Sequence, residues 1–147
     1  MKTVNEMRLV LASRSVNESM ARASVAAFIA PLDPTLDELG DIKTAVSEAV
    51  TNCIVHAYPD GIGRVTVAVK IFDDDTAEIT VRDTGRGIPD VGKARQSLYT
   101  TGGPERSGMG FTIMESFMDK LKVRSLVGKG TTVVMRKRII KRGARAD

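Results

Sequence analysis

Two pairs of segments with alternating apolar and polar residues place the strongest constraint on how this chain can fold. Residues 64–72 alternate around valine and isoleucine, residues 77–82 do the same, and three aspartates at 73–75 separate the two segments. The second pair lies near the end of the chain and is joined by Gly128-Lys129-Gly130. Strands joined by such short turns run antiparallel, whereas parallel strands need a crossover of a dozen or more residues. The sequence therefore predicts a mixed or antiparallel sheet.

Apolar residues at helical spacing predict two consecutive helices after a short opening strand around residues 7–11. The first helix is predicted to open at a capping box formed by Ser15 and Glu18. The second is predicted to begin at an N-cap, Asp33, with proline at the first helical position, and to run toward Tyr58.

A third helix is predicted over residues 109–120, after a long and weakly patterned stretch between residues 91 and 108. The predicted order is then strand, two helices, two strands, loop, helix and two strands. Such an order is typical of an α+β fold, a two-layer α/β sandwich with the helices on one face of the sheet. It differs from the doubly wound folds that bind dinucleotides.

The length and charge of the chain predict a single domain followed by a basic tail. At 147 residues the chain can bury one core. Its net charge of +4 is concentrated at the end, because residues 136–147 hold six basic residues and one acid. Residues 1–135, with 16 basic and 17 acidic residues, form the expected domain. The tail is either a solvated segment or a docking segment for an acidic partner.

The cysteine content and the distribution of apolar residues indicate a cytoplasmic protein. The single cysteine, Cys53, cannot form an internal disulfide and falls in an apolar helical pattern, so we expect it to be a small core residue. No apolar run approaches the roughly 20 residues of a membrane span. We therefore expect no membrane association, and the near-neutral domain gives no indication of direct nucleic-acid binding.

A stripe of polar residues on the second predicted helix could carry chemistry. Glu48, Asn52 and His56 are spaced four apart and share one side of that helix. An asparagine can coordinate Mg²⁺ through its amide oxygen, and a glutamate one turn earlier could accept a proton from an attacking hydroxyl or water. The same stripe could equally be the solvated side of an amphipathic helix. We take His56 as structural.

Three glycine motifs could surround a nucleotide, although each alone could be a plain turn. Asp83-Thr84-Gly85-Arg86-Gly87 follows a predicted strand, where the carboxylate could accept a hydrogen bond from a purine amino group and the glycines allow close approach. Gly108-Met109-Gly110 opens a predicted helix, a position that favours phosphate binding. The third motif, Gly128-Lys129-Gly130-Thr131-Thr132, joins two strands. The P-loop and dinucleotide-binding motifs are both absent.

The order of these motifs, from about Ser47 to Thr132, resembles that of the Bergerat-fold ATPases, which include gyrase and the sensor histidine kinases. This resemblance implies ATP and Mg²⁺ as cofactors, with Asn52 as the metal ligand and Asp83 on the adenine amino group. It implies a lid over residues 93–107. The further nucleotide-binding residues that it implies are Gly85, Gly87, Thr100, Thr101, Ser107, Gly108, Met109, Gly110 and Thr131.

A closer resemblance, over nearly the whole chain, is to the sporulation anti-sigma-F factors. It rests on residues 28–35, on the helix from Ile42 to Asn52 and on residues 105–115. The chain departs from the family pattern at Thr84 and Arg86, and in the lid at residues 100–104.

This closer resemblance implies a homodimer that binds RNA polymerase sigma factor F in its ATP-bound form. It also implies a kinase that phosphorylates a serine of an anti-anti-sigma protein. Glu48 would then be the general base, Arg106 would contact the γ-phosphate, and Arg22 would lie at the partner-binding surface. Transfer to a hydroxyl needs mainly alignment and charge neutralisation, which these residues could supply. A general-stress anti-sigma kinase and a non-catalytic, ATP-gated binding module are the alternatives.

Overall fold

The sheet has five antiparallel strands in the order β1-β2-β3-β5-β4. The structure is a computed structural model, and it describes residues 1–96 and 109–140. The strand bounds are β1 Thr3–Ala12, β2 Arg64–Phe72, β3 Thr76–Asp83, β4 Lys120–Leu126 and β5 Gly130–Arg138. The two hairpins that the alternating segments predict, β2–β3 and β4–β5, are both present. The predicted antiparallel sheet is confirmed.

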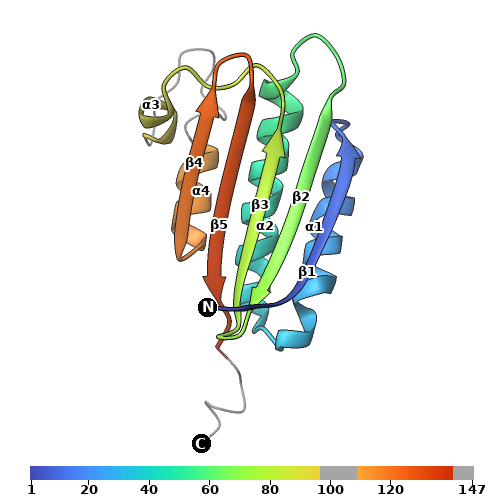
Figure 1. Ribbon diagram of the computed structural model, residues 1–147, viewed down its shortest axis with the longest axis vertical. Helices are drawn as coiled ribbons and strands as arrows, with labels where there is room; N and C mark the ends of the chain where they lie inside the picture. Colours follow the sequence, from blue (N-terminus) through green and yellow to red (C-terminus); the bar gives the residue numbers. More distant parts are fainter. Residues whose placement is uncertain (97–108, 141–147) are drawn as a thin grey trace, which may run out of the picture.

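The helices form a second layer on one face of this sheet, so the predicted α+β sandwich is confirmed (Figure 1). In Figure 1 the helices lie behind the strands, with α2 crossing behind the centre of the sheet between α1 and α4. The helical segments are α1 Asn17–Ile29, the 3₁₀ turn η1 Ala30–Leu32, α2 Leu36–Asn52, the π-helical turn η2 Cys53–Ala57, α3 Val91–Arg95 and α4 Met109–Phe117.

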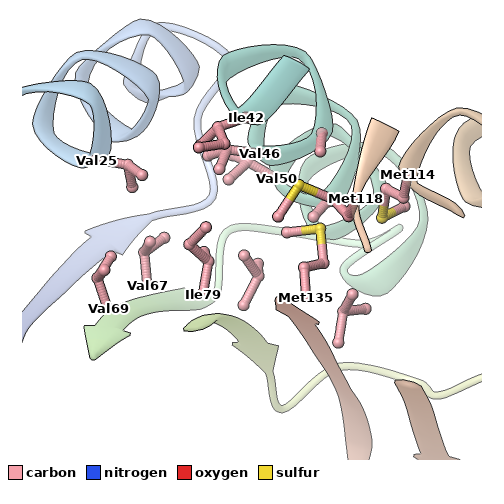
Figure 2. Packing of buried hydrophobic residues seen from close by; sticks show 14 of the residues in the cluster. Val25, Ile42, Val46, Val50, Val67, Val69, Ile79, Met114, Met118 and Met135 are labelled. Carbon is pink, nitrogen blue, oxygen red and sulfur yellow. The ribbon is translucent and has the colours of Figure 1, made fainter. Parts of the chain in front are cut away.

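Apolar side chains from both layers meet in one continuous core (Figure 2). From the helices, Val25, Val46 and Met114 point toward the sheet, where Val67 and Ile79 point back at them. All five side chains are fully buried. Since α2 contributes to this core along most of its length, its rotation about its own axis is fixed by packing.

The second helix begins later than predicted and with a different cap. Thr35 is its N-cap and forms a capping box with Glu38, in which each side chain accepts a hydrogen bond from the other's backbone N–H. Asp33, the predicted cap, instead adopts a left-handed conformation at φ 55° and ends the 3₁₀ turn. The Asp33-Pro34 prediction was therefore wrong, because a better capping pair follows two residues later.

The predicted capping box at the first helix is also wrong. Val16 is the N-cap of α1, and no side chain caps it. The Glu18 carboxylate instead accepts a hydrogen bond from the Thr51 hydroxyl of α2 and forms an ion pair with Arg22 at 3.6 Å. The Glu18 side chain therefore makes tertiary contacts instead of the capping contact that its spacing from Ser15 predicted.

Part of the segment predicted as a basic tail belongs to the sheet. Arg136, Lys137 and Arg138 complete β5. Arg136 forms an ion pair with Glu78 at 2.7 Å, and the Lys137 ammonium lies 3.7 Å from the Asp41 carboxylate. Residues 141–147 lie outside the described part of the chain. Among residues 1–96 and 109–140, no helix is long and apolar enough to cross a membrane.

Two substitutions on α2 test whether its buried face holds the layers together. Replacing the fully buried Ile42 by alanine should lower the free energy of unfolding by about 2–5 kcal/mol, because it leaves a cavity in the core. The control, Leu36→Ala, lies on the same helix at a position that is 84% exposed and should change stability by less than about 0.5 kcal/mol. Urea unfolding followed by circular dichroism measures both; equal losses would contradict this packing.

Candidate functional site

A cavity of about 490 Å³ lies at the end of the molecule where α2 and β3 end and β5 begins. This end is at the top of Figure 1. The cavity brings together residues far apart in the sequence, from the end of α2, the loop after β3, α4 and the start of β5. Its lining residues include Asn52, Cys53, His56, Asp83, Gly87, Ile88, Phe111 and Thr131.

Asp83 is a buried carboxylate on the wall of this cavity and only 6% of its surface is exposed. Its Oδ1 accepts hydrogen bonds from the backbone N–H groups of Gly85, at 2.9 Å, and Thr131, at 3.2 Å. Its Oδ2 accepts one from the Cys53 thiol at 3.5 Å. Since a thiol is a weak donor, Oδ2 retains capacity to accept a hydrogen bond from a ligand N–H.

Cys53 is buried as expected, and it also lines the cavity. Burial raises the pKa of its thiol well above the usual value, and the neighbouring Asp83 carboxylate raises it further. The thiol is therefore protonated at neutral pH and can donate its hydrogen bond to Asp83. Sequence spacing predicted the burial of Cys53 but could not reveal this contact, because Asp83 is 30 residues away.

Glu48 and Asn52 converge on the first turn of α4. A Cβ atom placed on Gly110 would lie 3.4 Å from both terminal atoms of the Asn52 amide and 3.4 Å from Oε1 of Glu48. Asn52 lines the cavity, whereas Glu48 lies beside it, one helical turn earlier. The polar stripe thus points at α4, and glycine at position 110 leaves space between these groups.

The donor atoms at this place suit Mg²⁺. The Asn52 amide oxygen is the kind of hard oxygen ligand that this ion prefers, and Mg²⁺ commonly takes one or two protein ligands, keeps several waters and binds substrate phosphates. Within the described residues, no cluster of three or more His, Cys, Asp or Glu side chains could hold a metal on its own. The donor set therefore suits a metal that arrives with a phosphate ligand, rather than a structural metal site.

The loop after β3 is held in place by backbone contacts with two other elements. The Arg86 N–H donates to the carbonyl of Ala57, the last residue of the π-helical turn, at 2.9 Å. A side chain at Gly85 would collide with that same carbonyl, so glycine is required there. The Gly128 N–H donates to the Arg86 carbonyl at 2.8 Å. Both motif glycines, Gly85 and Gly87, thus belong to a tightly anchored loop at the cavity.

Ser125 of β4 anchors this loop as well, although nothing in the local sequence singled it out. Its hydroxyl accepts a hydrogen bond from the Ile88 N–H at 2.7 Å and lies 2.8 Å from the Thr131 hydroxyl. The serine thereby joins β4, the loop over the cavity and the start of β5. Thr131 is buried, its backbone N–H donates to Asp83, and its hydroxyl lies beside that of Ser125.

Tyr58 is a second anchor that sequence reasoning missed. Its hydroxyl donates to the Arg64 carbonyl at 2.6 Å and accepts a hydrogen bond from the Thr84 N–H at 2.8 Å. The residue directly after Asp83 is therefore tied to the start of β2. A tyrosine just before a turn carries no signal for such a contact in the sequence.

Arg22 lies outside the cavity, between α1 and α2. Its guanidinium donates to the Ser47 hydroxyl at 3.1 Å and pairs with Glu18, which also accepts from Thr51. Ser47 and Thr51 directly precede Glu48 and Asn52 on α2, so Arg22 lies on the neighbouring side of the same helix.

The remaining predicted site residues belong to the segment between residues 93 and 109. Thr100, Thr101, Arg106, Ser107 and Gly108 lie outside the described residues, as does the predicted lid beyond residue 96. Met109 is the first residue of α4.

Comparison with known proteins accounts for this arrangement. Residues 11–137 match a family described as the histidine kinase-like ATPase domain. The chain is 58% identical over 141 residues to an anti-sigma F factor from Geobacillus kaustophilus, covering 93% of this chain and 94% of the relative. It belongs to the anti-sigma F factor family. A second member, from Caldanaerobacter subterraneus, is 57% identical over 136 residues and is matched over 92% of this chain and 94% of its own length.

Solved structures show that this anti-sigma F factor family member shares its fold with more distant proteins. The structure of the RsbU and RsbW domains of a Mycobacterium tuberculosis protein matches 92% of the chain, and 33% of that protein, with a TM-score of 0.69 at 20% identity. The histidine kinase domain of a blue-light activated kinase from Erythrobacter litoralis matches 83% of the chain and 61% of its own, with a TM-score of 0.57 at 22% identity. Membership of the histidine kinase-like ATPase domain family implies ATP binding.

Replacing Asp83 by asparagine tests the role of the buried carboxylate. Asparagine places an NH₂ group where one acceptor oxygen stood, so ATP affinity should fall by about tenfold or more, or about 1.4 kcal/mol. Isothermal titration calorimetry with ATP measures this loss. The control, Asp60→Asn, changes an exposed aspartate in the turn before β2 and should leave the affinity unchanged. Equal affinity in both variants would contradict the contact.

Proposed function

We propose that this protein binds Mg-ATP in the cavity, phosphorylates a serine of an anti-anti-sigma protein, and binds sigma factor F in its ATP-bound form. The observation that carries the proposal is the convergence of Glu48 and Asn52 on Gly110, next to a cavity whose wall holds Asp83. Asp83, a buried acceptor for a purine, and Asn52, a hard oxygen donor for the metal, thus line one cavity, and the Glu48 carboxylate lies beside it.

The different chemistry of Asp83 and Asn52 determines the orientation proposed for the bound nucleotide. Asp83, with its remaining acceptor capacity, would receive the adenine amino group, while the apolar side chains of Ile88 and Phe111 line the space for the ring. The phosphates would then extend toward Asn52 and the first turn of α4, where backbone N–H groups and the helix dipole favour negative charge. Gly85 and Gly87 would lie against the adenine, and Thr131 would support Asp83.

Glu48 is proposed as the general base and Asn52 as the metal ligand. The Glu48 carboxylate would take the proton from the substrate serine hydroxyl as its oxygen forms a bond to the γ-phosphorus and the bond to ADP breaks. Bound Mg²⁺ would supply charge neutralisation on the phosphate oxygens. Arg106 is proposed to contact the γ-phosphate, with Thr100, Thr101, Ser107, Gly108 and Met109 completing the nucleotide site.

The partners are proposed from the names of the relatives and from the resemblance described above. The relatives are named anti-sigma F factors, which supports a sigma factor as partner and favours the sporulation factor over a general-stress one. Arg22, held between α1 and α2 by Glu18 and Ser47, is proposed to contact that partner. We further propose that the protein is a cytoplasmic homodimer without direct binding to nucleic acid.

A phosphotransfer assay with a base-deficient variant tests the enzymatic part of this proposal. With Mg-ATP and the anti-anti-sigma protein, Glu48→Ala should lower the transfer rate by roughly 100-fold or more while ATP binding persists, because the base is lost. The control, Asp37→Ala, removes an exposed acid from the other end of the same helix and should transfer at the wild-type rate.

Two outcomes of that assay would overturn parts of the proposal. An unchanged rate in Glu48→Ala would refute the assignment of the base. Absence of transfer by the wild type, combined with ATP-dependent retention of the sigma factor in a pull-down, would identify a non-catalytic ATP-gated binding module instead. A pull-down with a general-stress sigma factor in parallel identifies the sigma factor that is bound.

A further inference from the structure

The face of the sheet opposite the helices carries a concentration of positive charge along β4. Lys120, Lys122 and Arg124 alternate along this strand and are all exposed, whereas Val123 between them is buried in the core. Because successive side chains of a strand point to opposite faces, the three cations share the open face. In Figure 1 this face is turned toward the viewer, and no described helix covers it.

The strand register extends this positive region across three strands. Arg124 of β4 pairs with Thr132 of β5, which pairs in turn with Arg82 of β3. The side chains of these strands enclose a shallow hollow of about 730 Å³. Thr80, Thr132 and Val134 line it along with the β4 cations. The hollow therefore combines small side chains with a basic rim.

Most of this charge is not neutralised within the described chain. Arg136, on the same face, forms an ion pair with Glu78 and lies over the ring of Phe72. In contrast, Arg82, Lys120, Lys122 and Arg124 form no ion pair with any residue in 1–96 or 109–140. Four uncompensated cations on one face repel each other, and an acidic partner would relieve that repulsion.

We propose that the open face of β3, β5 and β4 is a docking surface for an acidic segment of a partner protein. An extended segment repeats its side chains about every 6.6–6.8 Å on one face, which matches the spacing of Lys120, Lys122 and Arg124 along β4. Acidic side chains at alternate positions would each meet one cation, while the small side chains of the hollow accept the backbone. This surface is separate from the nucleotide cavity at the end of the sheet.

Two other occupants fit this face less well. A symmetric contact with a second copy that is centred on this hollow would bring the β4 cations of both copies close together, which is unfavourable. Nucleic-acid binding requires a dominant positive field, but residues 1–140, which include all of β5, carry 19 basic against 17 acidic residues, and Glu78 lies within the hollow. An acidic protein segment can bind through the local positive charge of the β4 cations alone.

The test uses a fluorescein-labelled peptide of four Glu-Thr repeats as the acidic probe, measured by fluorescence anisotropy against the full chain. Binding should weaken by about tenfold or more in the charge-reversed variant K122E/R124E, and less in the neutral K122Q/R124Q. The control K2E/R14E makes the same change in net charge at two exposed residues elsewhere and should bind like wild type. Amide chemical shifts should move in residues 120–126 and 130–138, and ATP affinity should be the same in all four proteins.

Several results would overturn the proposal. Equal losses of peptide affinity in K122E/R124E and K2E/R14E would show that binding depends on the net charge of the protein and not on this surface. Tighter binding of a single-stranded oligonucleotide than of the peptide would identify a nucleic-acid surface, and a dimer that dissociates only in K122E/R124E would identify a second copy as the occupant. Absence of peptide binding, with aggregation of the variant, would mean that these charges merely protect the sheet edge.

Discussion

The packing of α2 against the sheet is the interaction on which the rest of this structure depends. Ile42, Ala45, Val46, Ala49 and Val50 are buried on one side of this helix. Because they fix the rotation of the helix, Glu48 and Asn52, which are spaced four apart on another side of it, face α4. The same spacing that builds the core therefore directs Glu48 and Asn52 at the first turn of α4.

The end of α2 couples this packing to the buried carboxylate. The chain leaves the helix through a π-helical turn, a feature that is frequent at functional sites. The turn places Cys53 against Asp83 and the Ala57 carbonyl against the loop after β3. The geometry of the cavity around Asp83 thus depends on where α2 ends, while the position of Asn52 and Glu48 depends on how α2 is rotated.

The sheet and its pairing could be predicted from the sequence because the period-two alternation and the short turns are local signals. Helix starts were harder to predict, since Glu18 and Thr35 show that the choice of cap depends on tertiary contacts or on a competing pair nearby. The order of their motifs singled out Glu48, Asn52 and Asp83, and the structure places Asn52 and Asp83 on one cavity with Glu48 beside it. Ser125 and Tyr58 were not singled out, because their contacts join residues with no shared pattern.

The most direct measurement of the central claim is a crystal structure of the protein with Mg²⁺ and a non-hydrolysable ATP analogue. The account predicts the adenine amino group within hydrogen-bond distance of the Asp83 carboxylate, the metal on the Asn52 amide oxygen, and the γ-phosphate near Glu48. A nucleotide bound with its base away from Asp83, or with its phosphates directed away from the first turn of α4, would contradict it.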